Sequence, residues 1–131
     1  MISLRIRAAL AALTLAFLTV PTPAQAQPAG PASYLRLTIK DDTTGAARAV
    51  DLHCDPAGGS HPQPQDACAA IEPTGGDLDL LKGRPGVLCN DLYQPVTAFA
   101  QGAWQGRPVA WQHAFANPCG LHTKTDAVFH F

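Results

Sequence analysis

Apolar and polar side chains alternate along residues 34–40 (YLRLTIK) and again along residues 47–54 (ARAVDLHC). A period of two is typical of a β-strand that buries one face. The residues between these segments, 41–46, include aspartate, threonine and glycine and therefore indicate a turn. The pattern predicts two antiparallel strands joined by a short connection.

The next part of the chain lacks this alternation and is interrupted by proline and glycine. Residues 55–65 contain three prolines and two glycines, which predict a loop. The alanine-rich residues 65–71 predict a short helix that begins at Gln65 or Asp66 and ends before the next proline. Residues 77–82 predict one further helical turn.

Two apolar runs, residues 95–104 and 107–115, are separated by the dipeptide Gln105-Gly106 and predict a β-hairpin. Pro108 has no backbone N–H to donate to a neighbouring strand. The second strand of the hairpin is therefore expected at an edge of the sheet.

The C-terminal part of the chain holds two more segments. Residues 117–120 (NPCG) predict a turn, and residues 127–131 (AVFHF) predict a final short strand. In total the pattern predicts about five strands and one or two short helices. Because short turns join most of the strands, an antiparallel sheet with a helix on one face is favoured over a βαβ fold.

The first 26 residues have the features of a secretory signal peptide. Arg5 and Arg7 precede an apolar run at residues 8–20, and Ala24-Gln25-Ala26 is an A-x-A cleavage sequence. The run is shorter than the roughly 20 apolar residues of a membrane span. We therefore expect a signal peptide over residues 1–26 and a secreted, extracellular protein.

The chain after the signal peptide has 131 − 26 = 105 residues, a length that suits one domain. Residues 27–33 are rich in proline, alanine and glycine and are expected to form a flexible tail. Residues 34–131 are expected to fold as the domain. Because no second long apolar stretch follows, no membrane anchor is expected after signal removal.

The charge of the exported chain disfavours nucleic acid as a partner. Two of the nine basic residues lie in the signal peptide, which leaves 9 − 2 = 7 against ten acidic residues. The net charge is then 7 − 10 = −3 with histidine neutral. Nucleic-acid-binding domains carry a basic patch, and the sequence contains no basic run from which to build one.

All four cysteines, Cys54, Cys68, Cys89 and Cys119, follow the signal peptide. An even number in a small exported chain indicates two disulfides, and the absence of a C-x-x-C pair disfavours a metal site. Four cysteines allow three connectivities. Sequential pairing would close loops of about 14 and 30 residues, and each bridge would contribute on the order of 3 kcal/mol to stability.

The sequence contains no convincing catalytic set. Ser33 and Ser60 are the serines of the exported chain, which has no G-x-S-x-G sequence. The neighbours Ser60 and His61 would need a third group behind the histidine. The cysteines are expected to be oxidised and therefore unreactive. An enzyme, a metal centre and a cofactor are not expected.

The remaining histidines and the two tryptophans have ordinary structural interpretations. No H-E-x-x-H or similar spacing joins the histidines, so each is interpreted as a solvated or hydrogen-bonded surface residue. The histidines are His53, His61, His113, His122 and His130. Trp104 and Trp111 are expected to pack on the sheet face.

Residues 54–71 (CDPAGGSHPQPQDACAAI) closely resemble the signature of the Streptomyces subtilisin inhibitor family. That signature is C-x-P, a short gap, G-x-H-P, four residues, then A-C and an apolar residue shortly after. The matching positions are Cys54, Pro56, Gly59, His61, Pro62, Ala67 and Cys68. Ile71 stands where leucine is more usual.

Further similarities follow in order along nearly the whole exported chain. Gly75-Gly76-Asp77-Leu78 resembles the turn after the helix in this family, and Cys89 followed by Tyr93 and Pro95 resembles its reactive loop. The remaining matches are Trp104-Gln105-Gly106, Phe115-x-Asn117-x-Cys119 and Val128-Phe-x-Phe131.

The resemblance implies an α+β fold, with a five-stranded antiparallel sheet and two short helices cross-linked by the disulfides Cys54–Cys68 and Cys89–Cys119. It also implies a homodimer formed through the sheets. The implied function is inhibition of subtilisin-like serine proteases, without enzymatic activity of its own.

By its place after Cys89, the reactive bond implied by the resemblance is Asp91–Leu92. Such a loop must be extended and already fixed, so that the protease does not have to order it. Cys89 would hold the loop two residues before the bond, and Pro95 would stiffen it after the bond. The other loop residues expected to contact the protease are Leu88, Asn90, Tyr93 and Gln94.

The sequence departs from the family at the reactive bond. Methionine or lysine commonly precedes this bond in the family, with a proline before it, whereas Asp91 and Asn90 occupy these positions here. An apolar specificity pocket would have to desolvate the Asp91 carboxylate, which is costly without a partner. Leu88, further back along the loop, would still suit an apolar subsite. An acid-preferring serine endopeptidase would suit Asp91 better.

Two alternatives to inhibition remain open at this point. Asp91 and Asn90 favour a disulfide-linked exported binding module whose loop serves another partner. A small secreted hydrolase is disfavoured because a catalytic set is missing.

Overall fold

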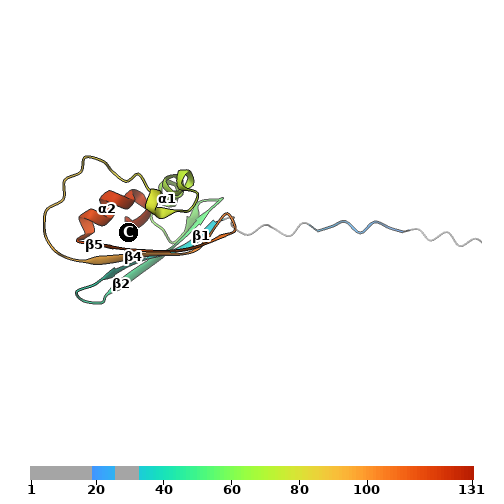
Figure 1. Cartoon of the computed structure of the whole chain (residues 1–131). Helices are drawn as coiled ribbons and strands as arrows, with labels where there is room; N and C mark the ends of the chain where they lie inside the picture. The colour runs from blue at the N-terminus through green and yellow to red at the C-terminus, as the bar shows by residue number, and fades with distance from the viewer. Residues whose placement is uncertain (1–18, 26–32) are drawn as a thin grey trace, which may run out of the picture.

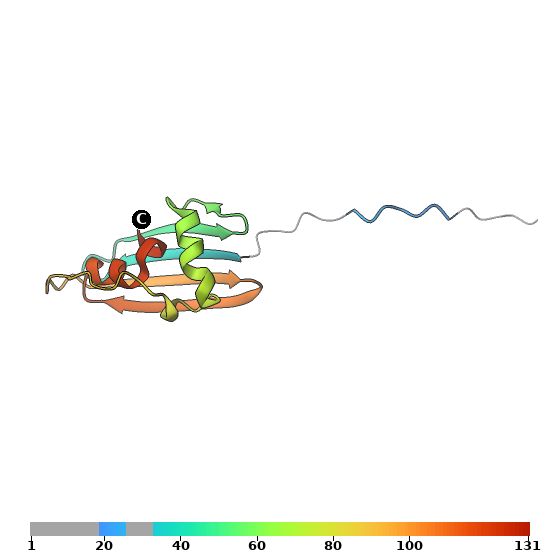
Figure 2. The ribbon, with the colours of Figure 1, turned by 90° about the horizontal axis from the view of Figure 1, so that it is seen from above.

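A five-stranded antiparallel sheet with both helices on one face forms the protein (Figures 1 and 2). This computed structural model describes residues 19–25 and 33–131. The strands are β1 (Ser33–Asp41), β2 (Ala47–Cys54), β3 (Gly58–Gly59), β4 (Val96–Trp104) and β5 (Arg107–Phe115). The helices are α1 (Pro64–Ile71) and α2 (Pro118–Thr125), with short 3-10 helices η1 (Glu72–Thr74), η2 (Leu78–Leu80) and η3 (Asp126–Phe129). The expected fold class is confirmed.

The predictions for the N-terminus fall mostly outside the described residues. The structure does not describe residues 1–18 and 26 of the expected signal peptide or residues 27–32 of the expected tail. Residues 19–25 are exposed and have no helix or strand. Within the described ranges, no helix is long and apolar enough to cross a membrane.

Strand β1, which was predicted from its alternating pattern, lies at the centre of the sheet, in the order β3-β2-β1-β4-β5. Leu35, Leu37 and Ile39 point to the helix-covered face and are at most 2% exposed. Each such burial contributes roughly 1.5–3 kcal/mol. Trp104 from β4 and Phe129 from η3 are the largest fully buried side chains among the described residues, and they belong to the core between the sheet and the helices.

The predicted strands and helices before the C-terminus are confirmed; two of them begin earlier than predicted, and a third difference is an additional short strand. The first strand begins at Ser33, which is buried and accepts a hydrogen bond from the backbone N–H of Gln105 at 3.0 Å. Helix α1 begins at Pro64. Proline suits the first helical position, because a backbone N–H there would have no partner within the helix. Strand β5 lies at an edge of the sheet, as Pro108 predicted.

The third difference is β3, which lies within the predicted loop. Gly59 pairs with Leu52 of β2 and has a φ of +94°. A Cβ atom at this position would lie 2.2 Å from the backbone oxygen of Asp51. Only glycine permits this close approach of the two backbones.

The predictions for the C-terminus, a turn over residues 117–120 and a strand over residues 127–131, are wrong. Asn117 is instead the N-cap of α2, and its Oδ1 accepts a hydrogen bond from the Gly120 N–H at 2.8 Å. Pro118 occupies the first helical position. The apolar residues that follow form η3 rather than a strand, because Val128 and Phe129 both enter the core.

Both disulfides have the pairing implied by the family resemblance, Cys54–Cys68 and Cys89–Cys119. The first connects the end of β2 to α1. The second connects the segment before β4 to α2. Within the described residues no cysteine is free.

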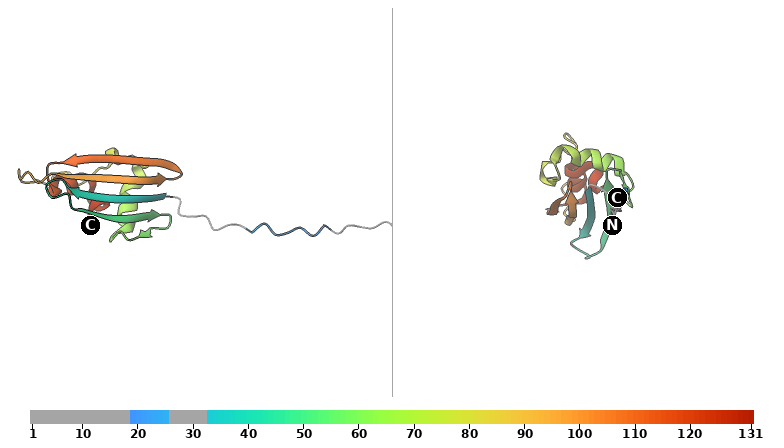
Figure 3. Two further views of the ribbon diagram at one scale, coloured as in Figure 1. Left: turned by 90° about the horizontal axis from the view of Figure 1, so that it is seen from below. Right: turned by 90° about the vertical axis from the view of Figure 1, so that its right-hand side faces the viewer.

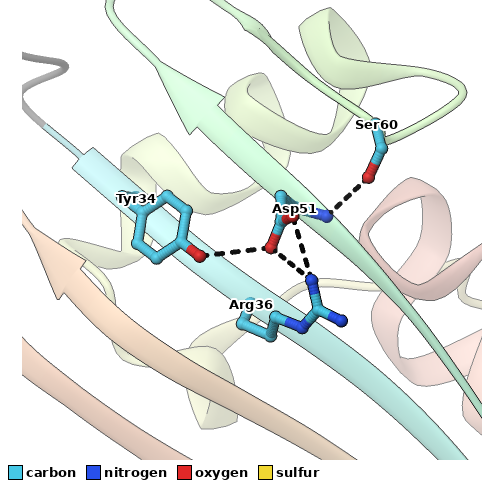
Figure 4. A network of polar contacts seen from close by, with 4 residues as sticks. All are labelled: Tyr34, Arg36, Asp51 and Ser60. Carbon is cyan, nitrogen blue, oxygen red and sulfur yellow. Dashed lines mark hydrogen bonds and ion pairs between the residues drawn. The ribbon is translucent and has the colours of Figure 1, made fainter.

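The sheet face opposite the helices carries no other described element (Figure 3). On this face Asp51 of β2 accepts hydrogen bonds from Arg36 Nη1 at 2.9 Å and from the Tyr34 hydroxyl at 3.2 Å (Figure 4). The backbone N–H of Asp51 donates to Ser60 Oγ at 2.9 Å. The hydrogen bond from Arg36 holds the pKa of Asp51 below its ordinary value. Because this ion pair is exposed and screened by solvent, it contributes little to stability.

His61 is not the surface histidine that was expected, since its side chain is only 4% exposed. Its Nδ1 accepts a hydrogen bond from the Gln63 N–H at 3.0 Å, and its Nε2 donates to the Val128 oxygen at 3.1 Å. These partners require the neutral ring with the proton on Nε2. Burial lowers the pKa of His61, and burial next to His130 also lowers the pKa of His122.

We predict that the protein loses stability as the pH falls from about 7 to 5.5. The unfolded chain gains protons on these histidines near their ordinary pKa of about 6.5, whereas the folded chain resists protonation, so acid favours unfolding. Each histidine contributes a slope of at most about 1.4 kcal/mol per pH unit. Thermal melting across this range measures the slope, and His61→Gln should flatten it. A melting temperature independent of pH would contradict the assignment.

Candidate functional site

The longest connection within the folded domain, residues 81–95, has neither helix nor strand. It projects beyond the end of the sheet where the β1–β2 turn also lies (Figures 1 and 2). Leu88 is 95% exposed, Leu92 59% and Tyr93 78%. Large apolar side chains are seldom gathered on an exposed loop unless it binds a partner. The segment Leu88–Pro95, called the binding loop below, is therefore the candidate site.

The N-terminal end of the binding loop is held against α2. The Cys89–Cys119 disulfide joins the loop to this helix, and Cys89 Sγ lies 3.5 Å from Thr123 Oγ1. Just before the loop, the Arg84 N–H donates to the Thr123 oxygen at 2.7 Å. At Gly83, with a φ of +63°, a Cβ would lie 2.2 Å from the same oxygen, so glycine is required for this contact.

Asn117 holds the middle of the binding loop. Its Nδ2 donates to the backbone oxygen of Leu92 at 3.0 Å and to that of Asn90 at 3.3 Å. These are the carbonyl groups on either side of Asp91. Asn117 is 8% exposed, and its Oδ1 simultaneously caps α2. One side chain therefore fixes both the loop and the helix that carries the Cys119 bridge.

The C-terminal end of the binding loop is held by backbone hydrogen bonds. The Gln94 N–H donates to the Ala116 oxygen at 2.9 Å, and the Asp42 N–H donates to the Pro95 oxygen at 3.0 Å. The loop then continues directly into β4. It is consequently held on both sides of Asp91 and Leu92.

The binding loop and Val87, which precedes it, also have backbone groups available to bind a partner. The N–H and C=O groups of Val87, Leu88 and Asp91 make no hydrogen bond to any described residue. The Asp91 carboxylate also lacks a hydrogen-bond or ion-pair partner among the described residues. An extended segment of this kind can pair with an exposed strand of another protein.

The structure tests two of the candidate sites that the sequence raised, a metal cluster and the Ser60–His61 pair. No group of three or more His, Cys, Asp or Glu side chains gathers within residues 19–25 and 33–131 in a way that could hold a metal ion. Ser60 Oγ accepts from Asp51, while both ring nitrogens of His61 are engaged elsewhere. These two neighbours therefore do not form a serine–histidine pair.

The residues that the sequence predicts to contact a protease lie together in one segment without helix or strand, where Cys89 and Pro95 are half-buried and the others are exposed. The role of Asn117, which had been interpreted as part of a turn, was not predicted. The signal was present, because Asn-Pro is a frequent N-cap and first helical residue. The two loop carbonyls that Asn117 binds could not be found from the sequence, since they lie 25 and 27 residues away.

Residues 31–117 match the family described as subtilisin inhibitor-like. The chain belongs to this family. It is 44% identical over 124 residues to trypsin inhibitor STI2 of Streptomyces longisporus, covering 91% of this chain and 85% of that protein. It is 44% identical over 91 residues to protease inhibitor SIL-V5 of Streptomyces luteoverticillatus, covering 68% and 84%.

A solved structure of the same family supports the fold. The protein is similar to Streptomyces caespitosus sermetstatin, solved in complex with Bacillus licheniformis subtilisin. The TM-score is 0.64 and the sequence identity 34%, over 75% of this chain and 97% of that chain.

Proposed function

We propose that this protein is a secreted inhibitor of subtilisin-like serine proteases, with the reactive bond at Asp91–Leu92. One observation carries the proposal. The apolar side chains of the binding loop are exposed, yet contacts with the rest of the fold hold the loop on both sides of this bond. Family membership supports the same function. The two disulfides support export, because such bonds persist in oxidising compartments.

The fixed loop explains how a substrate-like segment inhibits the protease instead of being cleaved and released. Before binding, the loop already has its conformation, so little ordering entropy opposes association. After cleavage, the Cys89–Cys119 bridge retains the new C-terminal end. The Gln94 and Pro95 hydrogen bonds retain the new N-terminal end, and Asn117 binds a carbonyl on each side. The ends therefore stay close enough to rejoin.

The side chains of the loop indicate the kind of protease cleft that it fits. Leu88, Leu92 and Tyr93 offer apolar surface to subsites on both sides of the cleaved bond. Asp91 offers a carboxylate to the specificity pocket. A pocket with basic or histidine donors satisfies this charge, which supports an acid-preferring serine endopeptidase as the target.

The test is to titrate the purified protein against a subtilisin and against an acid-preferring serine endopeptidase. Stoichiometric loss of protease activity is the expected result, with slow cleavage detected by mass spectrometry between Asp91 and Leu92. Cleavage elsewhere would contradict the assignment of the bond. Failure to inhibit any protease tested would favour the alternative, a disulfide-linked binding module that uses the same loop for another partner.

We also propose a homodimer formed through the sheet face opposite the helices. Only part of the apolar runs of β4 and β5 is available for this contact, because Ala98 and Ala100 are buried in the core. Phe99, between them, points to the other face and aligns with Thr38 and Gln112 of the neighbouring strands. A half-buried aromatic ring at the centre of this face supports an interface there.

Phe99→Lys is expected to convert the dimer to a monomer, because a dimer interface of this kind would bury the ammonium group without a partner. Sedimentation velocity at micromolar concentration measures the change. Val87→Lys, which places the same charge on an exposed position in the connection before β4, is the matched control and should remain dimeric. A monomeric natural protein under these conditions would contradict the proposed interface.

A further inference from the structure

A groove of about 370 Å³ lies beside the C-terminal half of the binding loop. The end of β1 and the β1–β2 turn line it together with the binding loop and the start of α2. Its principal lining residues are Asp41, Thr43, Thr44, Tyr93, Gln94 and Pro118. Two of these, Tyr93 and Gln94, directly follow the Asp91–Leu92 bond, so the groove is continuous with the binding loop.

The β1–β2 turn is attached to the loop rather than free beside it. The Asp42 N–H donates to the Pro95 oxygen at 3.0 Å, and Thr97 Oγ1 donates to Asp42 Oδ2 at 2.7 Å. Lys40 Nζ pairs with the other carboxylate oxygen of Asp42 at 3.2 Å. The turn and the binding loop are thus held in a fixed relation, and a protease bound to the loop would meet the turn as well.

The groove offers an available carboxylate oxygen. Asp41 Oδ1 accepts hydrogen bonds from the backbone N–H groups of Thr43 at 2.8 Å and Thr44 at 2.9 Å. Asp41 Oδ2 accepts no hydrogen bond from a backbone N–H of the described residues and has no ion-pair partner among them, because Lys40 pairs with Asp42 instead. The hydrogen bonds from Thr44 and Thr43 lower the pKa of Asp41, which keeps this carboxyl ionised.

The groove also offers an aromatic ring. Tyr93 is 78% exposed, and its hydroxyl makes no hydrogen bond to a described residue. A carboxylate next to an exposed ring matches an arginine side chain, whose planar guanidinium pairs with the first and stacks on the second. A neutral polar or apolar side chain would leave the Asp41 charge without a partner.

We propose that this groove is a secondary docking site for an arginine side chain on the rim of the target protease. The part of the protease rim that we mean borders the half of the active-site cleft that binds Leu92 and the residues after it. The proposal rests on the proposed function and on the placement of the reactive bond at Asp91–Leu92. It makes the β1–β2 turn a second determinant of which protease is bound, separate from Asp91.

The test compares the natural protein with Asp41→Asn, which keeps an Oδ1 acceptor for the turn and removes the charge. Inhibition constants are measured against two subtilisins that differ only by arginine or alanine at the rim position facing the groove. Asp41→Asn is expected to weaken inhibition of the arginine form about five- to tenfold. It should leave inhibition of the alanine form unchanged within about twofold. Asp66→Asn removes the same charge from the exposed first turn of α1 and serves as the matched control.

The possible outcomes separate this proposal from the proposed function. An equal effect of Asp41→Asn on both subtilisins, or an equal effect of Asp66→Asn, would overturn the docking site while leaving inhibition intact. Failure of the natural protein to inhibit both subtilisins and an acid-preferring serine endopeptidase would instead overturn the proposed function and this site with it. Melting temperatures of both variants close to that of the natural protein show that the turn has kept its structure.

Discussion

Replacing Asn117 with alanine is expected to turn the inhibitor into a substrate of its target protease. The change removes the two hydrogen bonds to the loop carbonyls on either side of Asp91. At about 0.5–1.5 kcal/mol each, their loss should raise the inhibition constant roughly 5- to 100-fold. It should also accelerate cleavage of the Asp91–Leu92 bond, because the new ends are no longer held together. Inhibition kinetics and chromatography of the cleaved product measure both effects.

Asn117→Ala also removes the cap of α2, which costs about 1 kcal/mol of stability and must be separated from the effect on the loop. Asn117→Asp makes this separation, because a carboxylate keeps the acceptor for the Gly120 N–H but has no donor for the loop. The helix cap is then retained, but the carboxylate faces the Asn90 and Leu92 oxygens without a donor, so inhibition should weaken at least as much as in the alanine variant. If Asn117→Asp inhibits as tightly and is cleaved as slowly as the natural protein, Asn117 is only a helix cap.

Asn117 illustrates which parts of this site a sequence can predict. Strands were predictable because alternation along β1 reflects a physical constraint within a few residues, namely one buried and one exposed face. Pro108 predicted an edge strand for an equally local reason, its missing N–H. The exposed loop itself followed from the family resemblance and the position of Cys89.

Contacts between distant residues were not predictable in the same way. The C-terminal residues AVFHF have the alternation of a strand, yet η3 forms because Val128 and Phe129 fill the space beneath α1 and α2. His61 looks like an ordinary polar loop residue until its ring is seen bonded to the Val128 oxygen, 67 residues away. In both cases tertiary packing decides the outcome for a short segment whose local preference is weak.

Asp91→Met is expected to have the largest effect on which protease the loop inhibits. In the free protein the Asp91 carboxylate is exposed and has no partner among the described residues, so water solvates it fully. Entry into an apolar specificity pocket removes this water without supplying a donor. Methionine removes that penalty, and even 3 kcal/mol corresponds to roughly two orders of magnitude in affinity. Tighter inhibition of a subtilisin with an apolar pocket is therefore expected.

An acid-preferring serine endopeptidase should respond in the opposite direction. Its pocket supplies donors to a carboxylate, and Asp91→Met discards a charge-assisted hydrogen bond of about 1.5–3 kcal/mol. Asp91→Asn separates charge from shape, because the amide has nearly the same size as the carboxylate but is neutral. Against both proteases this variant should lie between the natural protein and the methionine variant.

The structure makes this comparison direct, because the contacts that hold the loop do not involve the Asp91 side chain. The Cys89–Cys119 bridge and the Asn117 hydrogen bonds are unaffected by the substitution. Leu88, Leu92 and Tyr93 also remain available for the same subsites. Any change in the inhibition constant therefore reports the specificity pocket itself. If Asp91→Met changes neither inhibition constant by as much as tenfold, Asp91 does not enter the pocket and the reactive bond lies elsewhere in the loop.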